Sequence, residues 1–371
     1  GAGANPVWAA DTDTVTTLRP NVNPLIINGD CAISQRSTSV TGITGSGYNT
    51  IDRFKVGFAM GTWTQTQESL TSGNAYTDGF SNALKMDCTT ADTSVGSSDR
   101  LALSYNIEGQ DLQLLKKGTA NAEPVTISFW VKATKTGTNI LELYDNDNNR
   151  QISIAYTVSS SDTWEYILLN LPADTTGVLG DDNGSSLAIN WWMGAGSNFS
   201  SGTLSTSWSS VTDADRAVGQ VNHADSTSNN FHITAAQLEV GTYTSATIPP
   251  FQHESFGDNL LRCQRYYFRT PVLQNQVFGT GFCSNSIVAR GLFENYQVMR
   301  SAPSISRSSG TDFAVHQMSS STQTTALAFY YITNKTSLWY ADVSSGLTEG
   351  NGALLIDDGG ANAYIEGNAE L

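Results

Sequence analysis

The sequence is poor in charged residues, which make up 14% of its 371 positions. Basic residues are the scarcer sign, because 19 Lys and Arg stand against 34 Asp and Glu and leave a net charge of -15. A chain this acidic repels both the phosphate backbone of nucleic acids and the surface of anionic membranes. We therefore expect no nucleic-acid partner, while neutral glycans and basic partners remain open.

Long apolar runs are also missing. No stretch of about 18 residues is predominantly apolar, so we expect no membrane insertion. The opening segment GAGANPVWAADTDT has no basic part followed by an apolar part, and we expect no signal peptide.

Cysteine is scarce and dispersed. Cys31, Cys88, Cys263 and Cys283 lie far apart and form neither a CxxC pair nor a Cys/His cluster. This spacing indicates no zinc site and no disulfide scaffold, so we predict buried free thiols.

Sequence frames for catalysis or metal binding are absent as well. The histidines are scattered, and no HExxH or GxSxG frame occurs. The run DNDNN at 145–149 opens like a calcium loop, but Arg150 and Tyr156 replace the Gly and Glu that such a loop needs, so we predict a hairpin turn. We expect no enzyme activity, no cofactor and no metal. A glycosidase needs only two suitably spaced carboxylates, and that alternative stays open.

The residues that are abundant favour β-structure. Ser, Thr, Asn and Gly are frequent, and aromatics reach 10%, with 8 Trp. In VTISFWVKA at 125–133 every second residue is apolar, while Thr126, Ser128, Trp130 and Lys132 share the other face. Similar segments recur between turn formers at 139–145, 151–158, 163–171, 186–193 and 230–240. This spacing predicts an all-β sandwich or jelly roll.

The chain divides into four parts. We predict a linker or an extended tail at 1–22, a jelly-roll domain at 23–249, a short connector helix at 250–270 and a smaller C-terminal β-sandwich at 271–371. The helix is expected because Ser255 and Asp258 suggest a capping box ahead of Leu260 and Leu261.

The order of several segments resembles tail-fibre and receptor-binding proteins of tailed bacteriophages with a carbohydrate-binding-module-like jelly roll. These segments are NPLIINGDCAISQRST (23–38), IDRF (51–54), the hairpin region 129–166, the run AAQLEVGTYTSATIPPFQHESFGDNLLRCQRYYFRT (235–270) and SAPSI (301–305). The first resembles the first jelly-roll strand of that group, and GAGANPVWAADTDT (1–14) resembles the short fibre junction that precedes it. Ala32 stands where related jelly rolls often have a calcium-binding Glu, so the resemblance does not extend to that calcium site.

The resemblance implies a virion fibre or receptor-binding protein that attaches to the host cell surface, through glycan. Its implied partners are two further copies in a homotrimer, other virion structural proteins through the N-terminus, and host surface glycan. Its implied location is the virion, after assembly in the host cytoplasm. Two alternatives remain: a capsid decoration or head-fibre protein without a receptor, and a polysaccharide depolymerase.

In the group that the chain resembles, the connector helix lies at the trimer axis. We therefore expect Phe256, Leu260 and Leu261 to face neighbouring copies, with Arg265 pairing to a carboxylate of another chain. Packing within the same subunit is the alternative.

Outward aromatics beside amides and hydroxyls are typical of sugar sites, because a pyranose ring stacks on them. Alternation in NWWMG (190–194) assigns Trp191 to the core and directs Asn190 and Trp192 outward. The candidate carbohydrate-binding residues are Trp130, Tyr144, Asn190, Trp192 and, in the loop 194–208, Trp208. Cover by a loop or by another subunit is the alternative for each of them.

Overall fold

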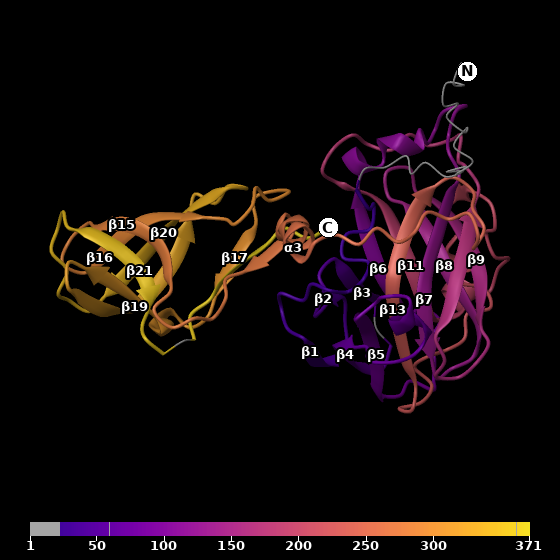
Figure 1. Cartoon of the computed structure of the whole chain (residues 1–371), viewed down its shortest axis with the longest axis horizontal. Coiled ribbons are helices and arrows are strands. Elements are labelled where there is room, and N and C mark those ends of the chain that lie inside the picture. The colour runs from indigo at the N-terminus through magenta and orange to yellow at the C-terminus, as the bar shows by residue number, and fades with distance from the viewer. Residues whose placement is uncertain (1–22, 59, 361) are drawn as a thin grey trace, which may run out of the picture.

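The computed structural model describes residues 23–371 except 59 and 361, so the predicted junction at 1–22 lies outside the described residues. Antiparallel sheets dominate, which confirms the all-β prediction. Figure 1 shows a large β-sandwich and a smaller β unit, with α3 and the C-terminus between them. Among the described residues no helix is long and apolar enough to cross a membrane.

The large unit is a sandwich of two antiparallel sheets. The six-stranded sheet has the order β1 (Ser39–Ile43), β4 (Thr62–Ser69), β5 (Asn82–Thr90), β13 (Asn230–Val240), β7 (Val125–Ala133), β10 (Glu165–Leu171). The seven-stranded sheet has the order β12 (Ser209–Ser210), β9 (Arg150–Val158), β8 (Gly137–Asp145), β11 (Ser185–Ala195), β6 (Arg100–Glu108), β3 (Phe54–Phe58), β2 (Gly47–Tyr48). Short helices α1 (Asn74–Thr77) and α2 (Ser197–Ser200) lie in connections. The non-consecutive neighbours show crossovers between the sheets, as in a jelly roll.

The inner faces of both sheets form one core. Phe129 of β7 and Trp191 of β11 meet edge to face, with ring centroids 5.9 Å apart. The predicted alternation is confirmed, since the apolar positions of 125–133 and Trp191 all belong to this core. The predicted buried free thiols are also confirmed, because all four cysteines are buried and unpaired.

The segment 23–38 differs from its predicted role as the first strand. It forms turns, and the first strand is β1. Asn28 and Cys31 have φ values of 61° and 57°, a left-handed conformation that ends extended structure. The Asn28 side chain then accepts from the Ile33 amide at 2.8 Å and closes the turn.

The smaller unit is a closed barrel beside a small sheet. The barrel has the order β15 (Val277–Cys283), β16 (Val288–Glu294), β20 (Thr336–Val343), β19 (Ser320–Tyr330), β18 (Phe313–Gln317), β21 (Gly352–Asp357). The three-stranded sheet has the order β14 (Tyr267–Arg269), β22 (Ile365–Asn368), β17 (Ser304–Arg307). A second open sandwich was expected here, but β21 pairs with both β15 and β18 and closes the sheet. Alternation alone does not distinguish these two arrangements.

The connector helix α3 covers Phe256–Gln264, and Ser255 caps it by accepting from the Asp258 amide at 3.1 Å, as predicted. It is shorter than the predicted 250–270, because the residues of β14 pair with β22 instead. Two of the residues expected to face neighbouring copies have partners within the same subunit. Leu260 packs against the chain's own cluster around Tyr266, and Arg265 pairs with its own Glu108 at 2.7 Å.

The last residues of the chain return to the sandwich. Glu370 lies between Arg36 and Arg53, and the Tyr48 hydroxyl donates to the Leu371 carbonyl at 2.8 Å. This contact ties the start of the sandwich to the end of the C-terminal unit.

Candidate functional site

The structure separates the predicted glycan residues. Trp130 lines a cleft on the outer face of the six-stranded sheet. Tyr144 and Asn190 line a smaller hollow on the outer face of the seven-stranded sheet. Trp192 and Trp208 line neither. The five residues therefore do not form one site.

The cleft has a volume of about 610 Å³, a size typical of small-ligand sites. Trp130 of β7 and Tyr166 of β10 stand directly opposite one another in the strand ladder. Their ring centroids are 5.4 Å apart at a tilt of 53°. Tyr166 is 37% exposed, whereas Trp130 presents 9% of its surface. Together they give the cleft an aromatic wall.

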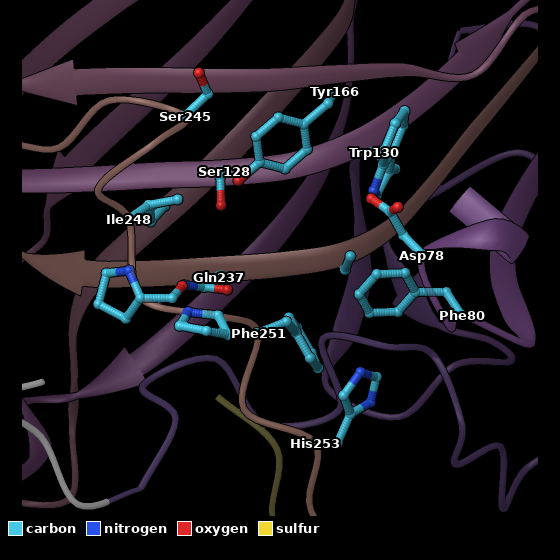
Figure 2. Close-up of a pocket in the computed structure, with 13 residues that line it drawn as sticks. Asp78, Phe80, Ser128, Trp130, Tyr166, Gln237, Ser245, Ile248, Phe251 and His253 are labelled. Carbon is cyan, nitrogen blue, oxygen red and sulfur yellow. The ribbon is translucent and has the colours of Figure 1, made fainter. Parts of the chain in front are cut away.

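A second group of rings faces that wall. Figure 2 shows Phe80, Phe251 and His253 on the far side of the hollow from Tyr166. Phe80 follows α1, while the other two lie on the chain that leaves β13. Their centroids lie 4.9–5.2 Å apart in all three pairings. The mutual packing fixes the rings before any ligand arrives.

A bulge in β13 shapes the floor of the cleft. Pairing with β7 shifts between Thr234 and Gln237, and Ala235 has a φ of 56°. The extra residue leaves Thr234 and Ala235 both on the outer side, while Ala236 remains in the core. A non-glycine residue in this conformation is held by its surroundings, and such strain concentrates at functional sites.

Polar groups sit between the two aromatic walls. The Gln237 amide donates to the Pro249 carbonyl at 2.9 Å, which holds the crossing segment over the sheet. The Ser128 and Tyr166 hydroxyls are hydrogen-bonded to each other. Burial raises the pKa of Tyr166, and the negative charge of Asp78 adds to this rise, while the bond to Ser128 opposes it. Rings with interspersed amide, hydroxyl and carboxylate groups can stack on a sugar ring and bind its hydroxyls.

Trp192 corrects the expectation of an open outer face. It lies on the outer side of β11, as alternation requires, but it is 0% exposed because Phe199 of α2 and Ala217 cover it. Its indole N–H donates to buried Glu142 at 3.1 Å. Trp208 is half-buried and donates to the Pro172 carbonyl at 2.9 Å. Trp192 is therefore not free to stack on a ligand, whereas Trp208 keeps part of its surface exposed and stays a candidate outside the cleft and the hollow.

Sequence reasoning missed most of the cleft. Tyr166 lies within a predicted strand, but the pairing of β10 with β7 joins segments that do not follow one another in the chain. Phe251 follows the Pro249–Pro250 pair, which lies at the predicted boundary between the jelly roll and the connector helix. An aromatic directly after two prolines is the signal that could have indicated a rigid cover.

No protein-family model and no curated protein sequence matches the chain. Among solved structures, it is similar to an enzymatically active domain of tailspike protein 4 of bacteriophage CBA120, at 12% identity and a TM-score of 0.29, covering 58% of this chain and 21% of that one. It is also similar to the xylanase 10B CBM22–GH10 modules of Clostridium thermocellum, complexed with xylohexaose, at 10% identity and a TM-score of 0.27, covering 57% and 27%. A family 61 carbohydrate-binding module in complex with β-1,4-galactotriose gives 10% identity and a TM-score of 0.27, covering 58% and 97%. The chain thus spans less than a third of the first two.

Proposed function

We propose that the chain is an attachment protein that binds glycan in the cleft of the six-stranded sheet. The observation that carries the proposal is the pair of facing aromatic walls, Trp130 with Tyr166 and Phe80 with Phe251. A saccharide between them would stack on the rings. Its hydroxyls would replace hydrogen bonds to water with hydrogen bonds to the hydroxyl and amide groups of the floor.

We further propose that this binding serves attachment of a bacteriophage to its host, as a fibre or receptor-binding protein within the virion. The support is the order of sequence segments described above together with the aromatic cleft, in which Tyr166 is the exposed ring. Each site would bind weakly, and several copies would raise the avidity.

Binding rather than hydrolysis is the chemistry that the cleft favours. Among its described lining residues Asp78 is the one carboxylate, whereas most glycosidases use a pair. Release of reducing sugar from host polysaccharide by the purified protein would contradict this part of the proposal.

The test is a saturation-transfer NMR and titration screen against neutral oligosaccharides. We expect Tyr166→Ala to weaken binding about fivefold, since one stacked ring contributes about 1 kcal/mol. The control is Tyr331→Ala, because Tyr331 is an exposed tyrosine of the barrel unit, outside the cleft. Equal binding by the two variants, or no binding by the native chain to neutral or host-derived glycans, would overturn the proposal.

A further inference from the structure

A second hollow lies on the other face of the sandwich. It has a volume of about 270 Å³ and is lined by residues of β3, β6, β8 and β11. Small residues keep it open: a Cβ on Gly57 would meet the Ser104 hydroxyl oxygen at 2.4 Å. Tyr144 and Asn190, which alternation directs outward, contribute to its wall and floor.

The charge of this hollow is opposite to that of the chain. Lys55, Arg100 and Arg216 line it, although the net charge of the protein is -15. Only Arg216 is neutralised within the described residues: it binds Glu142 at 2.7 Å and Asp213 at 3.3 Å. Arg100 and Lys55 have no carboxylate within 4.0 Å in the described part of the chain.

Arg100 is held in place without being neutralised. Its guanidinium lies 3.4 Å from the ring centroid of Phe58 and 5.0 Å from that of Phe199. Burial and the like charge of Arg216 lower the pKa of Arg100. Asp213 and Glu142 act in the opposite direction, and an anion bound beside the guanidinium would further stabilise its charged form.

The floor supplies hydrogen-bonding groups suited to a sugar. The Ser104 hydroxyl donates to the Asn190 carbonyl oxygen at 2.6 Å, and the Asn190 amide donates to Glu142 at 3.0 Å. This network orients Asn190, whose amide has a second N–H. Tyr144 stands at the side, with its ring centroid 4.8 Å from the Arg216 guanidinium.

We propose that this hollow binds an acidic saccharide, a sugar whose carboxylate lies between Arg100 and Lys55 while its ring contacts Tyr144 and Asn190. The site is separate from the cleft, so the chain has two glycan sites of different charge preference on opposite faces. The proposal does not depend on binding of neutral sugar in the cleft.

The test compares trigalacturonate with neutral galactotriose by titration at low and at physiological salt. Arg100→Gln and Lys55→Gln should each weaken trigalacturonate binding about tenfold, because a charge-assisted contact is lost. Binding of galactotriose should not change. Lys116→Gln is the matched control, since Lys116 is an exposed lysine paired with Glu123, outside the hollow. Thermal melts check that each variant is folded. If Arg100→Gln does not fold, Lys55→Gln still tests the proposal.

Several outcomes would overturn the inference. These are equal weakening by Lys116→Gln, loss of trigalacturonate binding in Tyr166→Ala, no trigalacturonate binding by the native chain, and equally tight binding of inorganic phosphate. The first indicates general charge attraction, the second places the acidic sugar in the cleft, and the last indicates an anion site without sugar selectivity. Failure of galactotriose alone to bind would count against the cleft and leave the hollow supported.

Discussion

One buried carboxylate organises the outer face of the seven-stranded sheet. Glu142 is fully buried, and it accepts hydrogen bonds from Arg216, Asn190 and Trp192. A buried charge is stable only when it is paired and its lone pairs are satisfied. The three donor side chains therefore stabilise the folded state by pairing with Glu142. Of the three, only Arg216 and Asn190 also line the hollow.

Trp192 accordingly contributes to stability and does not contribute to the hollow. Trp192→Ala should lower the free energy of unfolding by roughly 3–5 kcal/mol, because it opens a cavity under α2. Trp192→Phe should lose less, because it keeps most of the apolar volume and Glu142 retains its other donors. Urea denaturation measures both variants. A stability loss from Trp192→Ala no larger than that from Trp192→Phe would show that the ring is not packed as described.

His223 lowers the free energy of unfolding as the pH falls below neutral. Burial lowers its pKa to about 3, and its ring nitrogen Nε2 lies 2.7 Å from the Asn139 carbonyl oxygen. In the unfolded chain its pKa is near 6.5, so only the unfolded state takes up a proton as the pH falls below that value. His223 therefore reduces stability progressively between pH 6.5 and 3, by about 2 kcal/mol between pH 7 and 5.

Asp52 acts in the opposite direction. Burial raises its pKa to about 6, so the folded state is protonated first and gains stability as the pH falls from 6 towards 3.8. His223→Gln should remove the loss and leave a chain that is more stable at pH 5 than at pH 7. Urea titrations at both pH values test this. If His223→Gln changes stability equally at the two pH values, the buried neutral imidazole is not the cause.

At the scale of elements, α3 exposes apolar side chains to solvent at two positions around its circumference. Phe256 and Leu261 are 65% and 43% exposed, while Leu260 is packed within the subunit. Two apolar side chains on one solvent-facing helix are candidates for contact with further copies. The proposed homotrimer would then use Phe256 and Leu261 instead of Leu260 and Arg265.

This arrangement separates assembly from folding. Leu261→Asp should reduce the mass in multi-angle light scattering from about three chains to one, and the monomer that results should remain folded apart from the stabilisation that assembly supplied. Leu260→Asp should instead lower the melting temperature, because it places a charge against a packed cluster. A native chain that is monomeric at micromolar concentration would contradict the trimer.

Local patterns in the sequence predict strands and helices better than they predict which distant segments pack over them. The alternation in 125–133 and 186–193 correctly assigned the inward and outward faces of β7 and β11. It could not show that α2 covers Trp192 or that β10 brings Tyr166 beside Trp130, because both depend on contacts between distant segments. The barrel closure and the cleft depend on the same kind of long-range pairing.

At the scale of the whole molecule, the two β units share a buried charge cluster. Arg53 is 1% exposed and pairs with Glu370, while its guanidinium lies 3.4 Å from the ring centroid of Tyr266. Arg36 lies 3.4 Å from the same Glu370 and 3.6 Å from the ring centroid of Tyr267. The sandwich supplies the cations, and the C-terminal part of the chain supplies Glu370 and the nearest tyrosine rings.

Glu370→Gln should therefore weaken the sandwich as well as the junction. It leaves the Arg53 charge buried without its counter-charge, which costs roughly 3–5 kcal/mol. Amide hydrogen exchange should accelerate at 265–269 and 365–371. Glu349→Gln is the control, because it makes the same charge change at an exposed position of the barrel unit. Indistinguishable exchange and stability in the two variants would contradict a structural role for Glu370.

The sandwich without the C-terminal residues should be less stable than the sandwich in the full chain. A chain ending at Ile248 has an independent core, but it lacks Glu370 and the nearest tyrosine rings over Arg36 and Arg53, those of Tyr267 and Tyr266. We expect it to melt at a lower temperature than the full chain. Arg53→Met in the shortened chain should recover part of the loss, because an apolar side chain of similar length needs no counter-charge. In the full chain the same substitution should gain less, since Arg53 is paired there. If Arg53→Met has the same effect in both lengths, the C-terminal residues do not stabilise the sandwich through this charge.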